Sequence, residues 1–137
     1  MHHSPVLIVG AGPAGSTASL FLSRLKVPHL LIEKAVFPRD KICGDALGGK
    51  VFSVLKKLDE SLVDDLRSHV SFTGSHGVSF FSPSGTRLDL PFSSVPRPAP
   101  GGVLSRLDFD HWLFSHTHSA YADVREGNQL LQLKRLN

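Results

Sequence analysis

The residues best suited to chemistry are three glycines near the start of the chain, in the stretch VGAGPAG from Val9 to Gly15. Gly10, Gly12 and Gly15 have the spacing G-x-G-x-x-G. In this pattern the first glycine permits a tight turn, the second lets a pyrophosphate approach the backbone, and the third lets a helix pack closely against a sheet. The same spacing also occurs in glycine turns of other α/β proteins, so its meaning depends on the elements around it.

Those elements are predicted on both sides of the glycines. The apolar run at residues 4–10 predicts a strand buried on both faces, and the three- and four-residue apolar steps of residues 13–26 predict a helix. Residues 29–34 predict a second strand, and the helix N-terminus would offer N–H groups to phosphates. Glu33 ends that strand, where a carboxylate can bind a ribose hydroxyl. An acid there favours FAD or NAD, with a free 2′-hydroxyl, over NADP.

Beyond the second strand, the sequence predicts helices and strands in a mixed order. They are a loop at residues 35–50, a helix at 50–58, a break at 59–61, a short helix through Leu66, antiparallel strands at 70–92, a loop at 93–102, a helix from about Leu107, and two strands around a turn at Gly127 and Asn128. In the last helix, the side chains expected to face inward are Leu107, Trp112, Leu113 and Phe114. These elements indicate an α/β, Rossmann-like fold with an antiparallel β insertion.

Composition excludes several classes of protein. The chain has 137 residues, of which 41% are hydrophobic and 20% charged, as is typical of one globular domain. Its net charge of +3 comes from dispersed lysines and arginines, so no nucleic-acid partner is expected. The one cysteine excludes an internal disulfide and a multi-cysteine metal site. No apolar run is long enough to predict a membrane span or a secretory signal, and we expect a cytoplasmic protein.

Four stretches occur in an order that resembles a known family: VLIVGAGPAGSTASLFLSR, LLIEK, FPRDKICGDAL and LSRLDFDHWLF. They are similar to the N-terminal part of FAD-dependent oxidoreductases of the geranylgeranyl reductase group, within the para-hydroxybenzoate-hydroxylase-like flavoproteins. The resemblance implies non-covalent FAD and reduction of a carbon–carbon double bond in a small, isoprenoid-like substrate, with NAD(P)H or ferredoxin as electron donor. A flavin-dependent monooxygenase or halogenase, and a truncated non-catalytic nucleotide-binding module, remain open as alternatives.

The resemblance also implies roles for individual residues. The cofactor-binding positions are Gly10, Gly12, Pro13, Ala14 and Gly15 at the pyrophosphate, Glu33 and Lys34 at the adenosine ribose, Arg39 facing the FAD, Gly44, Asp45 and Ala46 beside the flavin, Arg106 at the pyrophosphate, and Val124 at the adenine. Each is implied by its match to a family motif, and not by spacing alone.

Cys43 is the candidate catalytic thiol. Its basic neighbours Arg39 and Lys41 would favour the reactive thiolate, whereas the acidic neighbours Asp40 and Asp45 oppose it. A small residue that lines a pocket is therefore the favoured alternative. No metal ligands are expected, because the three histidines of one predicted helix lack the i, i+4 spacing of a helical metal site: His111, His116 and His118.

The chain departs from the family pattern at two positions and in length. The extended fingerprint prefers alanine at position 19 and glycine at position 26, where this chain has Ser19 and Lys26. No second FAD motif follows Arg125, so we expect an incomplete domain, equal to about the first third of an enzyme. On this interpretation residues 1–69 and 103–137 form the FAD-binding part, and residues 70–102 begin a substrate-binding sheet.

Overall fold

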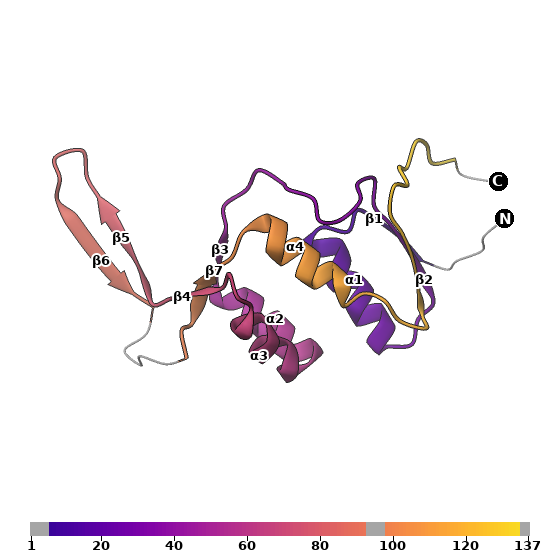
Figure 1. The fold of residues 1–137 in the computed structure, drawn as a ribbon, viewed down its shortest axis with the longest axis horizontal. Helices are drawn as coiled ribbons and strands as arrows, with labels where there is room; N and C mark the ends of the chain where they lie inside the picture. The colour runs from indigo at the N-terminus through magenta and orange to yellow at the C-terminus, as the bar shows by residue number, and fades with distance from the viewer. Residues whose placement is uncertain (1–5, 93–97, 135–137) are drawn as a thin grey trace. The chain divides into compact units, whose positions relative to one another are not determined.

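The computed structural model describes residues 6–92 and 98–134, which fall into two compact units (Figure 1). Residues 1–42 and 106–137 belong to one, named here the glycine-loop unit, and residues 43–105 belong to the other, the middle unit. The sequence-based division at 70–102 separates parts by function and not by compactness, and it stays a prediction.

The glycine-loop unit contains a three-stranded parallel sheet and two helices. β1 (Leu7–Val9) pairs with β2 (His29–Ile32), and β2 pairs with β8 (Ala122–Arg125). α1 (Pro13–Arg24) connects β1 to β2, whereas α4 (Arg106–Ser115) precedes β8 and packs against α1. Parallel strands connected through helices are the Rossmann-like arrangement, so the predicted fold class is confirmed.

The apolar core of the sheet is small and centres on rings from two segments. Ala11, Leu31 and Phe114 are buried, and Phe37 packs against them with its ring stacked on that of Phe114 at a centroid distance of 4.3 Å. Because Phe37 follows β2 and Phe114 lies on α4, this stack joins the first part of the chain to α4 and secures the loop that carries Arg39.

The buried face of α4 differs in part from the predicted face. Trp112, Leu113 and Phe114 are buried as expected, but Leu107 is 39% exposed and Phe109 is buried instead. Arg106 and Asp110 are also buried, one helical turn apart. A pattern based on apolar residues missed them because this face buries an ion pair.

The backbone at the C-terminus of α1 explains why the family fingerprint prefers glycine at position 26, where this chain has Lys26. Lys26 has a φ of 58°, in the left-handed region. Its N–H donates to the carbonyl of Ser23 at 3.0 Å, and the N–H of Val27 donates to that of Leu22 at 2.9 Å. These two bonds form a Schellman motif, in which glycine is the preferred residue at the left-handed position. Lys26 therefore adopts the conformation of the glycine it replaces.

Ser19, the second departure from the fingerprint, has a partner in β2. Its hydroxyl lies 2.7 Å from Nε2 of His29, and both residues are buried. Nδ1 of His29 lies 2.9 Å from the carbonyl oxygen of Val27, which can only accept a hydrogen bond, so Nδ1 carries a proton. In the neutral ring Nε2 then accepts from the Ser19 hydroxyl, a bond that alanine would not supply.

The middle unit combines a helix pair, a small sheet and a hairpin. α2 (Gly49–Leu58) and α3 (Glu60–Ser68) pack against each other through buried apolar side chains. Only Asp59 separates them, and its carboxylate accepts a bond from the Ser61 N–H at 2.9 Å, which caps α3. The predicted break is therefore confirmed but is one residue long.

The strands of the middle unit are antiparallel. The small sheet has the order β3 (Ala46–Leu47), β7 (Gly101–Val103), β4 (Thr73–Ser75). The hairpin pairs β5 (Gly77–Phe81) with β6 (Arg87–Pro91), so antiparallel strands around the turn at 83–85 are confirmed. β3 and β7 lie in stretches predicted as loops, because two- and three-residue strands carry too little periodicity to recognise.

Two further strand predictions are wrong. β1 is not buried on both faces: Ile8 packs against the core, but Leu7 and Val9 lie on the opposite face of the strand and are 42% and 53% exposed. Residues 129–134 form no strand, and residues 135–137 lie outside the described part. After Gly127 the chain turns back, and the N–H of Asn128 donates to the carbonyl of Glu33 at 2.9 Å. No helix in the described ranges is long and apolar enough to cross a membrane.

Candidate cofactor-binding site

The site starts at the glycine loop between β1 and α1. Gly10 has a φ of 93°, which only glycine adopts readily, and its N–H donates to the Ile32 carbonyl at 2.8 Å. Gly12 caps α1, and Pro13 occupies the first helical position, where its missing N–H costs no hydrogen bond. The next N–H groups, of Ala14 and Gly15, have no intrahelical partner by the geometry of a helix start. The start of the helix therefore carries a partial positive charge, which attracts an anion beside the loop.

The other two glycines are required by close approaches. A Cβ on Gly15 would lie 1.8 Å from the carbonyl oxygen of Gly10, so the first turn of α1 packs directly on the loop backbone. A Cβ on Gly12 would lie 3.4 Å from Nη2 of Arg39. The guanidinium of Arg39 thus lies next to the glycine at which a pyrophosphate is expected to approach.

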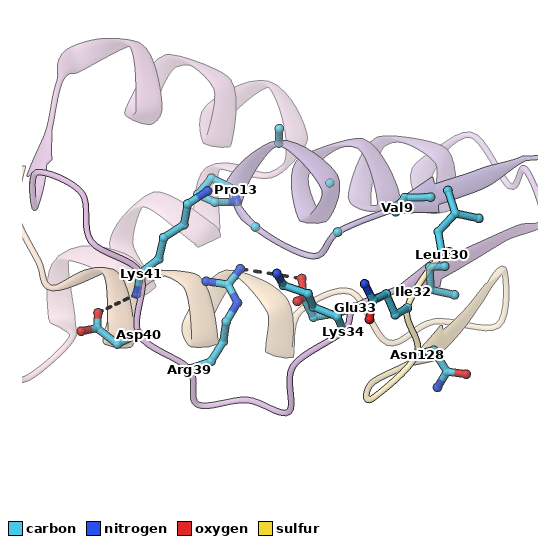
Figure 2. A pocket seen from close by; sticks show the side chains of 15 residues that line it. Val9, Pro13, Ile32, Glu33, Lys34, Arg39, Asp40, Lys41, Asn128 and Leu130 are labelled. Carbon is cyan, nitrogen blue, oxygen red and sulfur yellow. Dashed lines mark hydrogen bonds and ion pairs between the residues drawn. The ribbon is translucent and has the colours of Figure 1, made fainter. Parts of the chain in front are cut away.

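A cavity of about 680 Å³ opens beside this loop (Figure 2). Its lining residues all belong to the glycine-loop unit: Val9, Gly10, Gly12, Pro13, Ala14, Gly15, Ile32, Glu33, Lys34, Arg39, Asp40, Lys41, Asn128, Gln129 and Leu130. The lining combines backbone N–H donors, three basic side chains and one buried carboxylate. These are the groups that a dinucleotide with a diphosphate and ribose hydroxyls requires.

Glu33 closes the loop from the end of β2. Its Oε2 accepts the N–H of Ala11 at 2.7 Å, and its Oε1 accepts the N–H of Ala35 at 3.1 Å. The residue is 6% exposed. Each carboxylate oxygen has further lone pairs, so Glu33 can fix the glycine loop and still accept ribose hydroxyls.

An ion network connects the cavity to α4. Nη2 of Arg39 lies 3.8 Å from Oε2 of Glu33, and its Nη1 donates to Oδ2 of Asp110 at 2.9 Å. Asp110 in turn accepts two bonds from Arg106, from Nε at 2.7 Å and from Nη2 at 2.9 Å. The guanidinium of Arg39 also lies over the ring of Phe37, 4.8 Å from its centroid. Two arginines and two carboxylates therefore balance in charge.

The predicted cofactor-binding residues separate into three groups in the structure. Eight line the cavity together: Gly10, Gly12, Pro13, Ala14, Gly15, Glu33, Lys34 and Arg39. Arg106 and Val124 belong to the same unit but do not line it; Arg106 pairs with Asp110, and Val124 packs against the β-sheet core. Gly44, Asp45 and Ala46 belong to the middle unit, as does the candidate catalytic thiol Cys43. Cys43 is exposed, and the carbonyl of Asp45 accepts the N–H of Leu104 at 3.0 Å.

Sequence reasoning missed the segment 128–130 and Asp110. Asn128 was expected in a turn and residues 129–130 in a strand, whereas all three line the cavity. Asp110 follows Arg106 by four residues, a spacing at which opposite charges pair on a helix, and this was the available signal. Its bond to Arg39 joins positions 71 apart in the chain, which no local pattern reveals. No cluster of metal-ligating side chains is present in the part of the chain that the structure describes.

Sequence comparison finds relatives of this chain among known proteins. A menaquinone reductase of Mycobacterium tuberculosis is 34% identical over 105 residues, which cover 77% of this chain and 24% of that protein. A digeranylgeranylglycerophospholipid reductase of Methanosarcina mazei is 31% identical over 122 residues, covering 88% of this chain and 28% of that protein. The chain thus spans about a quarter of the length of these curated relatives.

Solved structures give the same fold. A geranylgeranyl bacteriochlorophyll reductase-like protein of Thermoplasma acidophilum superposes with a TM-score of 0.79 at 28% identity, covering 98% of this chain and 32% of that one. A myxobacterial FAD-dependent chondrochloren halogenase superposes with a TM-score of 0.78 at 26% identity, covering 90% and 28%. The family described as FAD binding domain matches residues 3–135. This chain therefore belongs to the FAD binding domain family, and FAD is its cofactor.

Proposed function

We propose that this chain supplies the FAD-binding part of an oxidoreductase that reduces a carbon–carbon double bond in an isoprenoid-like substrate. The observation that carries the proposal is the cavity in which the glycine loop, Glu33 and Arg39 meet. Two relatives at 31% and 34% identity are reductases, which supports the reaction class. NAD(P)H or ferredoxin as electron donor is proposed on the family resemblance alone.

The residues of the cavity would bind and orient the cofactor. When bound, FAD supplies the hydride chemistry, and the protein supplies position and electrostatics. The N–H groups at the start of α1 would bind the pyrophosphate, and Arg39 would place a positive charge beside it. Glu33, held by two backbone N–H groups, would accept ribose hydroxyls without having to reorient.

The remaining predicted residues stay proposals. Lys34 lines the cavity next to Glu33 and would lie at the ribose. Val124 is proposed to contact the adenine, and the residues Cys43, Gly44, Asp45 and Ala46 are proposed to lie beside the flavin, each on the family resemblance alone.

One other function is favoured by a specific observation. The superposition on a halogenase supports a flavin-dependent monooxygenase or halogenase, because the same fold carries that chemistry. A nucleotide-binding module without activity of its own is the remaining alternative. The experiments below separate the three.

The first test is FAD uptake by the purified chain. After incubation with FAD and gel filtration, we expect the visible absorption bands of oxidised flavin to elute with the protein. Glu33→Ala should weaken FAD binding about tenfold or more, because it removes the ribose acceptor and leaves the Ala11 N–H unpaired. Glu60→Ala, at an exposed position of α3, is the matched control and should bind FAD normally. A colourless wild-type fraction would contradict the proposed cofactor site.

The second test follows the reaction. The FAD-loaded chain is reduced with dithionite without oxygen and given geranylgeraniol, and a product heavier by two hydrogens supports the reductase. A product that gains oxygen or a halogen, when oxygen, NADH and bromide or chloride are supplied, supports the monooxygenase or halogenase. Bound FAD without any product supports the non-catalytic module. In an active preparation, unchanged turnover of Cys43→Ala would leave that thiol only a lining role.

A further inference from the structure

We propose that Asp110 is a positioning residue for the FAD diphosphate, acting through Arg39. It would hold the Arg39 guanidinium over the glycine loop, while Arg106 holds Asp110 in place. The inference rests on the FAD-binding half of the proposed function and is independent of the substrate. None of the sequence motifs that match the flavoprotein family assigned this aspartate a role.

The carboxylate of Asp110 is the shared anchor of both arginines. Asp110 is 1% exposed, and its Oδ2 accepts from Nη1 of Arg39 and from Nη2 of Arg106, each at 2.9 Å. Its Oδ1 accepts from Nε of Arg106 at 2.7 Å. Burying a carboxylate costs free energy unless such donors pair with it. Here the donors come from α4 itself and from the loop after β2, so Asp110 fixes that loop to the helix.

The other end of the Arg39 guanidinium reaches the cavity. Its Nη2 lies 3.8 Å from Oε2 of Glu33 and 3.4 Å from the place of a Cβ on Gly12. Arg39 therefore stretches between two carboxylates, directly across the glycine at which a diphosphate approaches the backbone. Arg39 lines the cavity, whereas Asp110 and Arg106 do not. Among the contacts that reach the cavity, Arg39 is therefore the route by which Asp110 would act on a bound diphosphate, besides its own charge.

These two routes predict opposite effects of one substitution. Asp110→Asn removes a negative charge near the cavity and keeps the shape of the side chain. If Asp110 acts through charge alone, the variant should bind a diphosphate more tightly, because less negative charge repels it. If Asp110 positions Arg39, the variant should bind more weakly, because the amide no longer holds the guanidinium with a charge-assisted bond.

The experiment compares ligand affinities of the full chain and its variants. FAD binding is followed by quenching of flavin fluorescence, and ADP and AMP binding by calorimetry. We expect Asp110→Asn to weaken FAD and ADP binding about 10- to 100-fold, the effect of one lost charged contact, and AMP binding less. Asp108→Asn makes the same chemical change on the same helix and should stay within about threefold of wild type. Tighter or unchanged ADP binding by folded Asp110→Asn would overturn the proposal.

A double-mutant cycle tests the route through Arg39. Arg39→Gln removes the guanidinium, and Asp110→Asn is then added in the same chain. We expect no further loss of ADP affinity in the double variant, because the residue that Asp110 positions is already absent. Fully additive losses would show that Asp110 acts independently of Arg39 and would overturn the inference.

Because Asp110 is buried, the fold of each variant is checked first. The near-ultraviolet circular dichroism of Trp112, the only tryptophan and a residue of α4, reports local packing. If Asp110→Asn loses this signal, Asp110→Glu replaces it, since it keeps the charge but displaces Arg39. Wild-type ADP affinity in folded Asp110→Glu would contradict positioning, and weaker binding would support it. If even the wild-type chain fails to bind FAD and ADP, the proposed cofactor site fails, and this inference with it.

Discussion

The two units of the chain use their side chains in opposite ways. The glycine-loop unit buries charge: Asp110 is 1% exposed and Glu33 is 6% exposed, each held by several hydrogen bonds. The hairpin of the middle unit exposes apolar surface instead, with Phe80, Phe81 and Leu88 more than half exposed. Burying an ion costs desolvation free energy unless the ion is fully paired. Such pairs are therefore expected where fixed side-chain geometry matters more than stability.

The contrast indicates what holds each region together. Around the cavity, side chains from α4, β2 and the following loop fix one another through directed bonds. In the hairpin, the backbone ladder from Gly77 to Pro91 supplies the pairing, and its apolar side chains add little burial. Substitutions should therefore affect the glycine-loop unit far more than the hairpin. Four pairs of variants compare positions in the two units, in order of expected effect.

The largest difference is expected between two leucine truncations. Leu113 of α4 is 1% exposed, and Leu113→Ala should lower the free energy of unfolding by about 2–5 kcal/mol, since it leaves a cavity. Leu88 of β6 is 56% exposed, and Leu88→Ala should change it by no more than about 0.5 kcal/mol. Urea unfolding followed by far-ultraviolet circular dichroism, to which the helices and strands of both units contribute, measures both. Equal losses would remove the contrast between the two regions.

The next largest effect is expected at the glycine loop. Gly15→Ala places a Cβ 1.8 Å from the Gly10 carbonyl oxygen, so the loop must move, at a cost of about 1–3 kcal/mol. FAD binding should be lost with it. Gly48→Ala, where a Cβ meets nothing within 4 Å, is the control and should cost less than about 1 kcal/mol and leave FAD binding intact. Normal FAD affinity in Gly15→Ala would refute a rigid loop.

A smaller, stabilising effect is expected at the end of α1. Lys26→Gly should raise the free energy of unfolding by about 0.5 kcal/mol, because glycine adopts the left-handed φ of 58° without strain. The greater conformational entropy of glycine in the unfolded chain offsets part of this gain. Lys57→Gly, inside α2, should instead lower it by about 0.5–1 kcal/mol. The same direction of change in both variants would show that the backbone conformation of Lys26 is not the cause.

The smallest effect concerns a carboxylate of the hairpin. The Ser79 hydroxyl, followed by the Arg87 guanidinium, lowers the pKa of Asp89 below its ordinary value. A lowered folded-state pKa gives a stabilisation that is present at neutral pH and is lost as the pH falls through that pKa. Ser79→Ala should raise the pKa of Asp89, so this loss begins at higher pH. An NMR titration measures the pKa of Asp89 in each variant. Ser82→Ala is the control and should leave this pKa unchanged, because the Ser82 hydroxyl is hydrogen-bonded to the Ser84 hydroxyl and to the Thr86 N–H.

The sequence was most informative where local pattern and contact coincide. The strand–helix–strand order around Gly10, Gly12 and Gly15 and the carboxylate of Glu33 were all predicted, because one short segment of chain forms this part of the cavity. The helix α2 and the antiparallel hairpin were recognised for the same reason, since periodicity within each element reports its own burial or pairing.

The failures share a physical cause, which is contact between distant parts of the chain. Asp110 is buried because Arg39 and Arg106 pair with it, and polarity alone places it outside. Residues 129–134 look like a strand, but the bond from Asn128 to Glu33 directs the chain along the cavity. The exposure of Val9 depends on which elements cover its face of the sheet, and no residue near it in sequence records that.

The pairing of β2 with β8 has a consequence for the order of folding. His29 pairs with Ala122, and the whole middle unit separates these two strands in the sequence. Closing such a long loop is costly in entropy, whereas β1, α1 and β2 are neighbours in the chain. We expect the β1–α1–β2 segment to form first and β8 to join last, after the middle unit has shortened the effective loop. Pulse-labelled hydrogen exchange should then protect the Leu30 amide, which donates to the Val6 carbonyl beside β1, before the His29 amide, which donates to the Tyr121 carbonyl beside β8. Simultaneous protection of the two amides would contradict this order.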